Sequence, residues 1–335
     1  LVTTTSPMPP LSDQSNTRRR EVFAAIAARD DLQFREVKSD FRSSWDNAFA
    51  ARLGYPLSVN AMTDTLLYTA SAVAAGWLEG CPNIYLAAES EVSDNARRHD
   101  RVVLFHHFMY SIPVQYAFSL LLAPWGMLNS SLTSPLRGPL IQALLLRRYP
   151  DLARLQYSCW KVGPDNAACS ACSKCLLMGL GIAASGGDPA SIGIELGTLM
   201  RYAATFKPRH ASRNEVGPLA RDRVTYEHEM NILRYLRDVR PGRLLRLRPG
   251  LLTSPRGWRS ILSYVRAHRR AAAREIEPAA GWRPGYAPFL LGPVRDRVLA
   301  IYNEMFNAAS PGEYAADLEG NKILVDSLDR CATHR

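Results

Sequence analysis

The sequence lacks a long hydrophobic run and a recognisable export signal. Its longest apolar stretches, 117–122 and 176–184, are much shorter than the ~18 residues that a transmembrane helix requires. Its first residues do not follow the order of a signal peptide, and internal repeats and low-complexity tracts are absent. These absences argue against an integral membrane or fibrous protein. We expect the chain in the cytoplasm, without a membrane partner.

Acidic residues are scarcer than basic ones. The chain has 31 Asp and Glu against 41 Lys and Arg, which gives a formal net charge of +10. Apolar residues make up 47% of its 335 residues, enough for a sizeable core in one large α/β domain with an appendage, or in two domains. A disordered chain is therefore excluded. The basic excess fits either an acidic partner or the codon bias of a GC-rich genome.

The first ninety residues alternate between strand and helix patterns. Residues 1–5 and 32–37 read as strands, 18–28 and 61–78 carry helical spacing, and 83–88 reads as a short buried strand. This order is typical of a parallel α/β sheet. Because the first residue is not Met and opens directly in a strand, we expect the natural chain to begin earlier.

Two loops of this pattern are candidate ligand sites. In parallel sheets ligands bind beyond the carboxyl ends of the strands, which singles out the loops that begin at Ser6 and at Glu89. The second loop contains Glu89, Glu91 and Asp94, whose carboxylates could hold Mg²⁺ or orient a substrate amine. The alternative is a solvated acidic loop that caps the next helix.

A histidine pair, His106 and His107, lies on a helix expected over 105–122. Histidines on an apolar helix are often packed and hydrogen-bonded within the core. A contact with substrate is the functional interpretation of this pair, and packing is the structural one.

Four of the six cysteines fall in one short segment, 159–175. Cys159, Cys169, Cys172 and Cys175 form the pattern C-x9-C-x2-C-x2-C. Zinc binds four thiolates in a tetrahedron, and C-x2-C spacing lets one tight turn present two sulfurs to the same ion. The segment therefore predicts a structural zinc knot, since four protein ligands leave no open position. Disulfides and an iron–sulfur cluster are the alternatives.

The surroundings of these cysteines are similar to a known enzyme family. Ser-Pro-Leu at 134–136, a short helix, and Tyr-Ser-Cys-Trp at 157–160 precede the C-x2-C-x2-C group. This order resembles the carboxy-terminal half of the PP-loop ATP pyrophosphatases related to 7-cyano-7-deazaguanine synthase. It also looks like the adenylating glutamate epimerases of peptidoglycan-precursor metabolism. The likeness covers roughly residues 1–181.

The resemblance implies a fold and a chemistry. The fold is the α/β, HUP-type (adenine nucleotide alpha hydrolase-like) parallel sheet with a four-cysteine zinc knot. The chemistry is ATP cleavage to AMP and pyrophosphate, with ATP and Mg²⁺ bound and a substrate carboxylate or carbonyl activated as an adenylate. The family's S-G-G-x-D-S phosphate loop does not occur in the sequence, and residues 1–5 align with the family's second strand. We therefore expect the loop to lie ahead of Leu1, and the alternative is that this member has lost the ATP chemistry.

The resemblance also nominates residues that would meet ATP or the substrate. Thr4, Thr5 and Ser6 lie at the end of the first predicted strand, where they would meet adenosine, and Arg18 and Arg19 could bind pyrophosphate or a carboxylate. A solvated helix start is the alternative for the arginines.

A second helix start, near 60–65, differs from the family. Asn-Ala-Met-Thr-Asp-Thr stands where the deazaguanine synthases carry an Arg-Asn pair, and Arg137-Gly138 replaces a lysine. Asp64 and Thr65 could still help helix-start amides to hold an anion, or could form an ordinary N-cap. We expect a different substrate pocket.

The last third of the chain has a different character. We expect a domain boundary at residue 200, with residues 201–335 a mostly helical and basic extension. Arginines recur between residues 234 and 274 at a density that could bind nucleic acid, bind an anionic small molecule, or form a solvated face.

Two functions follow from the whole sequence. One is an ATP-dependent adenylating enzyme of small-molecule metabolism, and the other is a tRNA-binding or tRNA-modifying zinc protein, or a non-catalytic binding module.

Overall fold

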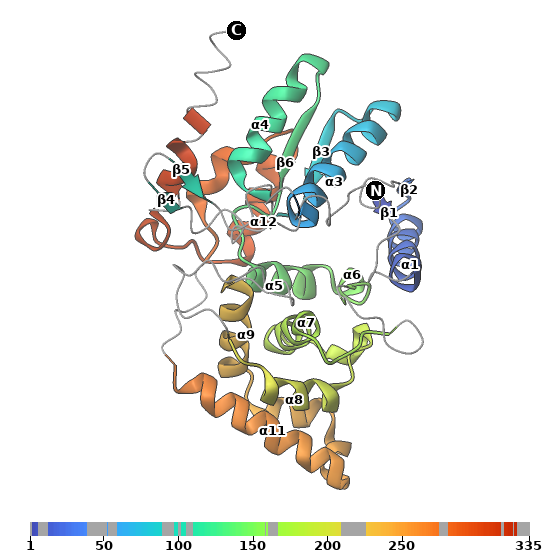
Figure 1. Ribbon diagram of the computed structural model, residues 1–335, viewed down its shortest axis with the longest axis vertical. Coiled ribbons are helices and arrows are strands. Elements are labelled where there is room, and N and C mark those ends of the chain that lie inside the picture. The colour runs from blue at the N-terminus through green and yellow to red at the C-terminus, as the bar shows by residue number, and fades with distance from the viewer. Residues whose placement is uncertain are drawn as a thin grey trace. The chain divides into compact units, whose positions relative to one another are not determined.

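The computed structural model describes most of the chain. The described residues are 2–5, 13–38, 52, 59–88, 97–99, 102–104, 110–157, 159, 167–208, 226–274, 281–315, 318–323 and 325–326. Helices predominate among them, and the strands are short (Figure 1).

The chain divides into two compact units, each made of segments that are far apart in the sequence. Unit 1 contains Leu1, Pro7–Phe34 and Gln142–Ala279. Unit 2 contains Val2–Ser6, Arg35–Ile141 and Ala280–Arg335. The boundary expected at residue 200 stays a prediction.

The strands of unit 2 pair mainly in parallel. The three two-stranded pairings of the described residues are β1 (Val2–Thr5) with β2 (Arg35–Lys38), β3 (Asn83–Leu86) with β6 (Leu128–Ser131), and antiparallel β4 (Arg97–His99) with β5 (Val102–Leu104). Parallel strands require a crossover connection. Parallel strands and helices therefore confirm the coarse α/β character of this unit.

Helices cover these strands within unit 2. α3 (Val59–Leu78) packs against β1 and β3, and α4 (Ile112–Leu122) packs against β6. Gly76 allows α3 to approach β3, because a Cβ at this position would lie 2.7 Å from Cδ1 of Ile84. The α3–β3 turn then brings β3 beside β6, and the backbone N–H of Leu128 donates to the carbonyl of Pro82 at 2.8 Å.

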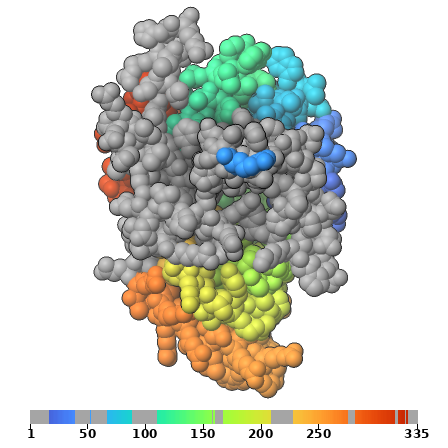
Figure 2. Space-filling view, in the orientation of Figure 1, coloured from blue at the N-terminus to red at the C-terminus, as the bar shows by residue number. Residues whose placement is uncertain are grey.

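Unit 1 has a helical core. Its main helices are α1 (Asp13–Arg29), α7 (Ser173–Ala184), α8 (Leu196–Thr205), α9 (Tyr226–Asp238) and α11 (Pro255–Ala272). α7, α8, α9 and α11 share one apolar cluster, in which Leu176, Leu180, Ile232 and Tyr264 are fully buried. Burial of such side chains stabilises each by about 1.5–3 kcal/mol. Figure 2 shows α8 in yellow and α11 in orange at the surface of this unit.

Several shorter helices complete the described structure. They are α5 (Gly138–Arg148), α6 (Pro150–Ala153), α10 (Pro241–Leu247), α12 (Arg295–Met305), η3 (Ala123–Trp125), η5 (Pro189–Ile192), η6 (Pro249–Thr253), η7 (Pro284–Phe289) and η8 (Pro311–Glu313). Within the described residues, no helix combines the length and the apolar character needed to cross a membrane.

Three helix starts differ from the sequence expectation. α1 begins at Asp13, so Arg18 and Arg19 lie in its second turn and not at its start. α3 begins at Val59, so Asp64 and Thr65 lie beyond the first turn, where backbone N–H groups are already bonded within the helix. The ligand contacts predicted for Asp64 and Thr65 therefore stay a prediction, without the helix-start position that the sequence indicated. α4 begins only at Ile112, because Pro113 fits the first turn of a helix and not its interior.

Candidate metal centre

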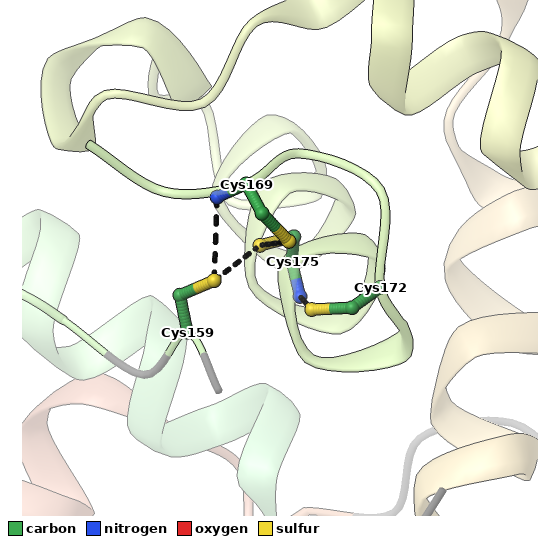
Figure 3. Close-up of side chains that lie close together, drawn as sticks. All are labelled: Cys159, Cys169, Cys172 and Cys175. Atoms are coloured by element: carbon green, nitrogen blue, oxygen red, sulfur yellow. Dashed lines mark hydrogen bonds between the residues drawn. The ribbon is translucent and has the colours of Figure 1, made fainter. Parts of the chain in front are cut away.

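The four clustered cysteines converge in unit 1. Their Sγ atoms all lie within 4.8 Å of one another (Figure 3). The Sγ atoms of Cys159 and Cys175 are 3.5 Å apart, and those of Cys169 and Cys175 are 3.8 Å apart. Cys159 and Cys175 are buried, whereas Cys169 and Cys172 are half-buried. The fold therefore brings together the four cysteines that the sequence predicted as metal ligands.

The start of α7 positions two of the sulfurs. Cys172 is the N-cap of this helix, and its Sγ accepts a hydrogen bond from the backbone N–H of Cys175 at 3.4 Å. The carbonyl of Cys172 accepts from the N–H of Leu176 at 2.9 Å. A thiolate at this position also faces the positive end of the helix dipole. The C-x2-C spacing thus places both sulfurs at one helix end.

Cys159 reaches the cluster from a separate segment, as Figure 3 shows. Its Sγ accepts a hydrogen bond from the backbone N–H of Cys169 at 3.3 Å. Cys159 is 5% exposed and Cys175 is 2% exposed, and both belong to the apolar core cluster of the unit. A metal held here would tie this distant segment to α7.

Ser170 shapes the turn between Cys169 and Cys172. Its φ of 58° is in the left-handed region, which residues other than glycine rarely adopt. Its hydroxyl donates to the carbonyl of Ala168 at 3.3 Å and accepts from the backbone N–H of Glu195 at 2.7 Å. Two hydrogen bonds therefore compensate for a backbone conformation that curls the chain around the sulfurs.

Glu195 connects this turn to α8. It is the N-cap of α8, and its carboxylate accepts from the backbone N–H groups of Gly197 at 2.7 Å and Thr198 at 2.5 Å. Burial raises the pKa of Glu195, but the bonds to Thr198 and Gly197 and the nearby Arg201 charge outweigh it, so that the pKa is lowered. One residue thus caps α8 and anchors the cysteine turn.

Hydrogen bonds among the thiols separate their pKa values. Bonds from the side chains of Cys159 and Cys175 lower the pKa of Cys172 to about 2. The bond to Cys172 raises the pKa of Cys159 to about 12, and bonds to Cys159 and Cys172 raise the pKa of Cys175. The cluster therefore already favours one thiolate, which is the form of cysteine that binds a metal.

The donor set fits a tetrahedral ion of the zinc type. Four sulfurs about 2.3 Å from such an ion lie about 3.8 Å from one another. The Sγ–Sγ separations of Cys175 from Cys159 and Cys169 match this edge, and all four cysteines are free thiols. The disulfide alternative therefore has no support in the structure. The cluster could hold a metal ion such as zinc.

A separate small pocket lies in unit 2, at the carboxyl ends of β3 and β6. It is lined by Ala88, Tyr110, Ile112, Gln115, Tyr116, Asn129, Ser131, Ser134, Phe289 and Leu291. Its interior holds about 10 Å³, which is room for one water molecule. The hydroxyl of Ser131 donates to the carbonyl of Ala88 at 2.7 Å and accepts from its N–H at 2.9 Å. These bonds keep the two strand ends together.

Asn129 is the fully buried polar residue of this pocket. Its Nδ2 donates to Oε1 of Gln115 at 2.5 Å and to the carbonyl of Gln115 at 3.3 Å. Its Oδ1 accepts no hydrogen bond from any residue that the structure describes. A buried amide oxygen without a donor costs about 1–3 kcal/mol, so a ligand that donates to it would bind favourably.

The other predicted site residues lie in several elements of the chain, and some of them lie outside the described structure. Ser6, Glu89, Glu91, Asp94, His106 and His107 lie outside the described residues, so the roles proposed for them stay predictions. Thr4 and Thr5 lie at the end of β1, and Asp64 and Thr65 lie in α3. Arg18 forms an ion pair with Glu21 at 3.0 Å, and Arg19 is half-buried beside it.

Sequence reasoning missed Ser170, Glu195 and Asn129. Ser170 stands inside the C-x2-C motif, where a small polar residue fits a left-handed turn. The partner of Ser170 is 25 residues away, and no local pattern marks it. Asn129 lies on a strand that the pattern did not predict.

No protein-family model matches the chain, and no curated protein or solved structure shows significant similarity to it.

Proposed function

We propose that the chain belongs to an ATP-dependent adenylating enzyme of the PP-loop, HUP-type class, in which the four cysteines hold a structural zinc ion. The cysteine cluster carries this proposal: four thiols with family-like spacing lie within 4.8 Å of one another. The parallel strand pairs support the fold assignment. The upstream Ser-Pro-Leu segment and the arrangement of motifs support the family assignment.

Zinc would act here as a fold element and not as a catalyst. Four thiolate ligands complete its shell, so that no position remains for water or substrate. The chain's own contribution is to gather Cys159, the turn at Ser170 and the start of α7 around one point. The thiols lose their protons when the ion binds, and the N–H groups of Cys169 and Cys175 stabilise the resulting charge.

The pocket at the ends of β3 and β6 is our candidate for part of the substrate site. Ligands of parallel α/β sheets bind at these strand ends. The described lining residues offer hydroxyl and amide groups and no charge, which suits an uncharged group of about the size of a water molecule, such as a hydroxyl. The donor that Oδ1 of Asn129 lacks would come from this group.

The reaction proposed is adenylation of a small carboxylate. A carboxylate oxygen attacks the α-phosphorus of ATP, a new oxygen–phosphorus bond forms, and the α–β bond breaks with release of pyrophosphate bound to Mg²⁺. Positioning and electrostatic stabilisation supply most of the acceleration in such phosphoryl transfers. Thr4, Thr5 and Ser6 would meet the nucleotide, as proposed for the end of β1.

An exchange assay tests this function. The natural gene product, with any residues that precede Leu1, is incubated with ATP, Mg²⁺, labelled pyrophosphate and a panel of small carboxylates. We expect label to enter ATP only with the correct carboxylate. Ser134→Ala should raise KM for that carboxylate, whereas Ser191→Ala on the surface of unit 1 should not. Exchange with no member of the panel, by a protein that also fails to bind ATP, would refute the proposal.

A further inference from the structure

The positive charge of the chain is concentrated in one segment. Residues 239–274 contain ten arginines and no Asp, Glu or Lys. The formal net charge of the whole chain is also +10. Outside this segment the charges therefore cancel, with 31 basic and 31 acidic side chains. The excess therefore belongs to α10, η6 and α11 and is not a general property of the protein.

α11 presents part of this charge on one exposed face. Residues three or four apart lie on the same side of a helix. Arg259, Leu262, Arg266 and Arg269 follow this spacing and are all exposed, and Arg256 and Trp258 are exposed at the start of the helix. Figure 2 shows this segment in orange at the molecular surface. The stripe is thus a row of guanidinium groups along one helix.

The arginines of this segment are not neutralised within the described structure. None of the ten forms an ion pair with a described acidic residue, and the ion pair closest to them in sequence, Arg237–Asp238, lies before the segment. Arg270 donates to the carbonyl of Ala204 at 2.6 Å, which is a neutral partner, so no described acidic residue compensates its charge. Guanidinium groups bind phosphate oxygens in bidentate geometry.

The apolar face of α11 is already buried against the other helices of unit 1. Ile261, Tyr264, Ala267 and Ala271 are buried in the core of unit 1. A helix that lies in a membrane surface needs its apolar face free, so an anionic membrane is disfavoured as the partner. The exposed apolar side chains left on the helix are Trp258, which is 50% exposed, and Leu262, which is 52% exposed. An exposed indole beside arginines suits stacking with an unpaired base.

We propose that the arginine stripe of α11, with Trp258 at its start, binds single-stranded nucleic acid. The arginines contact successive phosphates and Trp258 stacks on one base. These contacts involve the backbone and a base face, so the surface binds unpaired RNA and DNA in the same manner. This function is separate from adenylation and does not require ATP.

Fluorescence anisotropy tests the proposal. The probe is a labelled 20-nucleotide single strand of mixed sequence, as RNA and as DNA, with the matching duplex for comparison, over a series of salt concentrations. Each phosphate contact contributes about 0.7 to the slope of log affinity against log salt for single strands. The double variant Arg259→Gln, Arg266→Gln should therefore lower the slope by about 1.4. Trp258→Ala should weaken single-strand binding about tenfold and duplex binding much less.

Matched controls keep the result specific to this surface. Arg295→Gln with Arg297→Gln removes two exposed arginines of α12 in the other unit, and Trp125→Ala removes an exposed indole of η3. These controls should leave affinity and slope near the wild-type values. Equal losses in the control and test pairs, stronger binding to the duplex, or binding only to vesicles of phosphatidylserine and phosphatidylcholine would overturn the proposal.

Discussion

The hydroxyl oxygen of Ser170 accepts a hydrogen bond from the backbone N–H of Glu195 at 2.7 Å. Ser170 stands between two of the four clustered cysteines, and Glu195 caps α8. The bond joins segments that are 25 residues apart. The hydrogen bond therefore couples the cysteine turn to the helical core. A substitution that disturbs one of them should also destabilise the other.

Ser170→Ala tests this connection. Alanine keeps the Cβ and so the cost of the left-handed backbone, and it removes only the hydroxyl that bonds Ala168 and Glu195. We expect a loss of about 1–2 kcal/mol in the free energy of unfolding, because the N–H of Glu195 loses its partner. Urea unfolding with excess zinc measures this loss. The control Ser191→Ala removes an exposed hydroxyl bonded to Asp188 and should cost less than about 0.5 kcal/mol; equal losses would show that the bridge is unimportant.

Gly292 is a position where unit 2 admits no side chain. Its φ is +98°, and a Cβ would collide with Oη of Tyr85 on β3 and lie 2.9 Å from Cδ2 of Leu128 on β6. We expect Gly292→Ala to lower the free energy of unfolding by about 1–3 kcal/mol, from overpacking and backbone strain. Thermal unfolding measures it against Gly312→Ala, which meets no atom within 4 Å. A Gly292→Ala protein as stable as the control would contradict this packing of unit 2.

The carboxylate of Glu313 makes a pH-dependent contribution to the stability of unit 2. The N–H of Ser310 donates to its carboxylate at 2.9 Å, and this bond, with the Ser310 hydroxyl and the charges of Arg137 and Arg283, lowers its pKa below the ordinary 4.5. A lowered carboxyl pKa stabilises the fold above the unfolded-state pKa, and this stabilisation disappears as the pH falls through the folded-state pKa. Because the group is exposed, we expect only about 0.3–0.5 kcal/mol.

Comparison of the wild type with Glu313→Gln measures this contribution. The difference in unfolding free energy should be present at pH 7 and should disappear as the pH falls through the lowered pKa of Glu313. The cysteine cluster is common to both proteins and lies in the other unit, so its own sensitivity to acid cancels in the difference. A difference that grows as the pH falls would contradict the lowered pKa.

Removal of the metal should destabilise unit 1 more than unit 2. The proposed ion joins Cys159 to α7, and α7 packs on α9 in the shared core. A structural zinc ion contributes directly to folding free energy, so a chelator should lower the unfolding temperature of the wild type. Hydrogen exchange should show the loss of protection in α7 and α8 before β3 and β6. Uniform loss in both units would contradict a local structural role.

The sequence predicts the local parts of this architecture well. Cys169, Cys172 and Cys175 need only one turn and one helix start to meet, and Cys159 lies ten positions before them, so the spacing was sufficient to predict the cluster. Strand–helix alternation predicted parallel pairing because β-branched residues mark β1 and apolar residues mark β3. The HUP-type fold and the ATP chemistry remain proposals, since they depend on how larger segments assemble.

The features that the sequence did not predict have physical reasons. β6 carries Asn129, Ser130 and Ser131, all buried, so its inward side chains are polar and produce no apolar alternation. The first turn of α1 is made of polar residues that also favour turns. The sequence therefore predicted the helix to begin at residue 18, although it begins at Asp13. The bond between Ser170 and Glu195 joins positions with no shared periodicity.

Metal stoichiometry tests the central claim most directly. Plasma mass spectrometry of the purified chain should find about one zinc per chain, reduced to a small fraction in Cys172→Ser and Cys159→Ser. Cys81→Ser, an exposed cysteine outside the cluster, should keep the wild-type content. Iron in place of zinc, or no metal in the wild-type protein, would contradict the structural zinc centre and with it the best support for the proposed enzyme class.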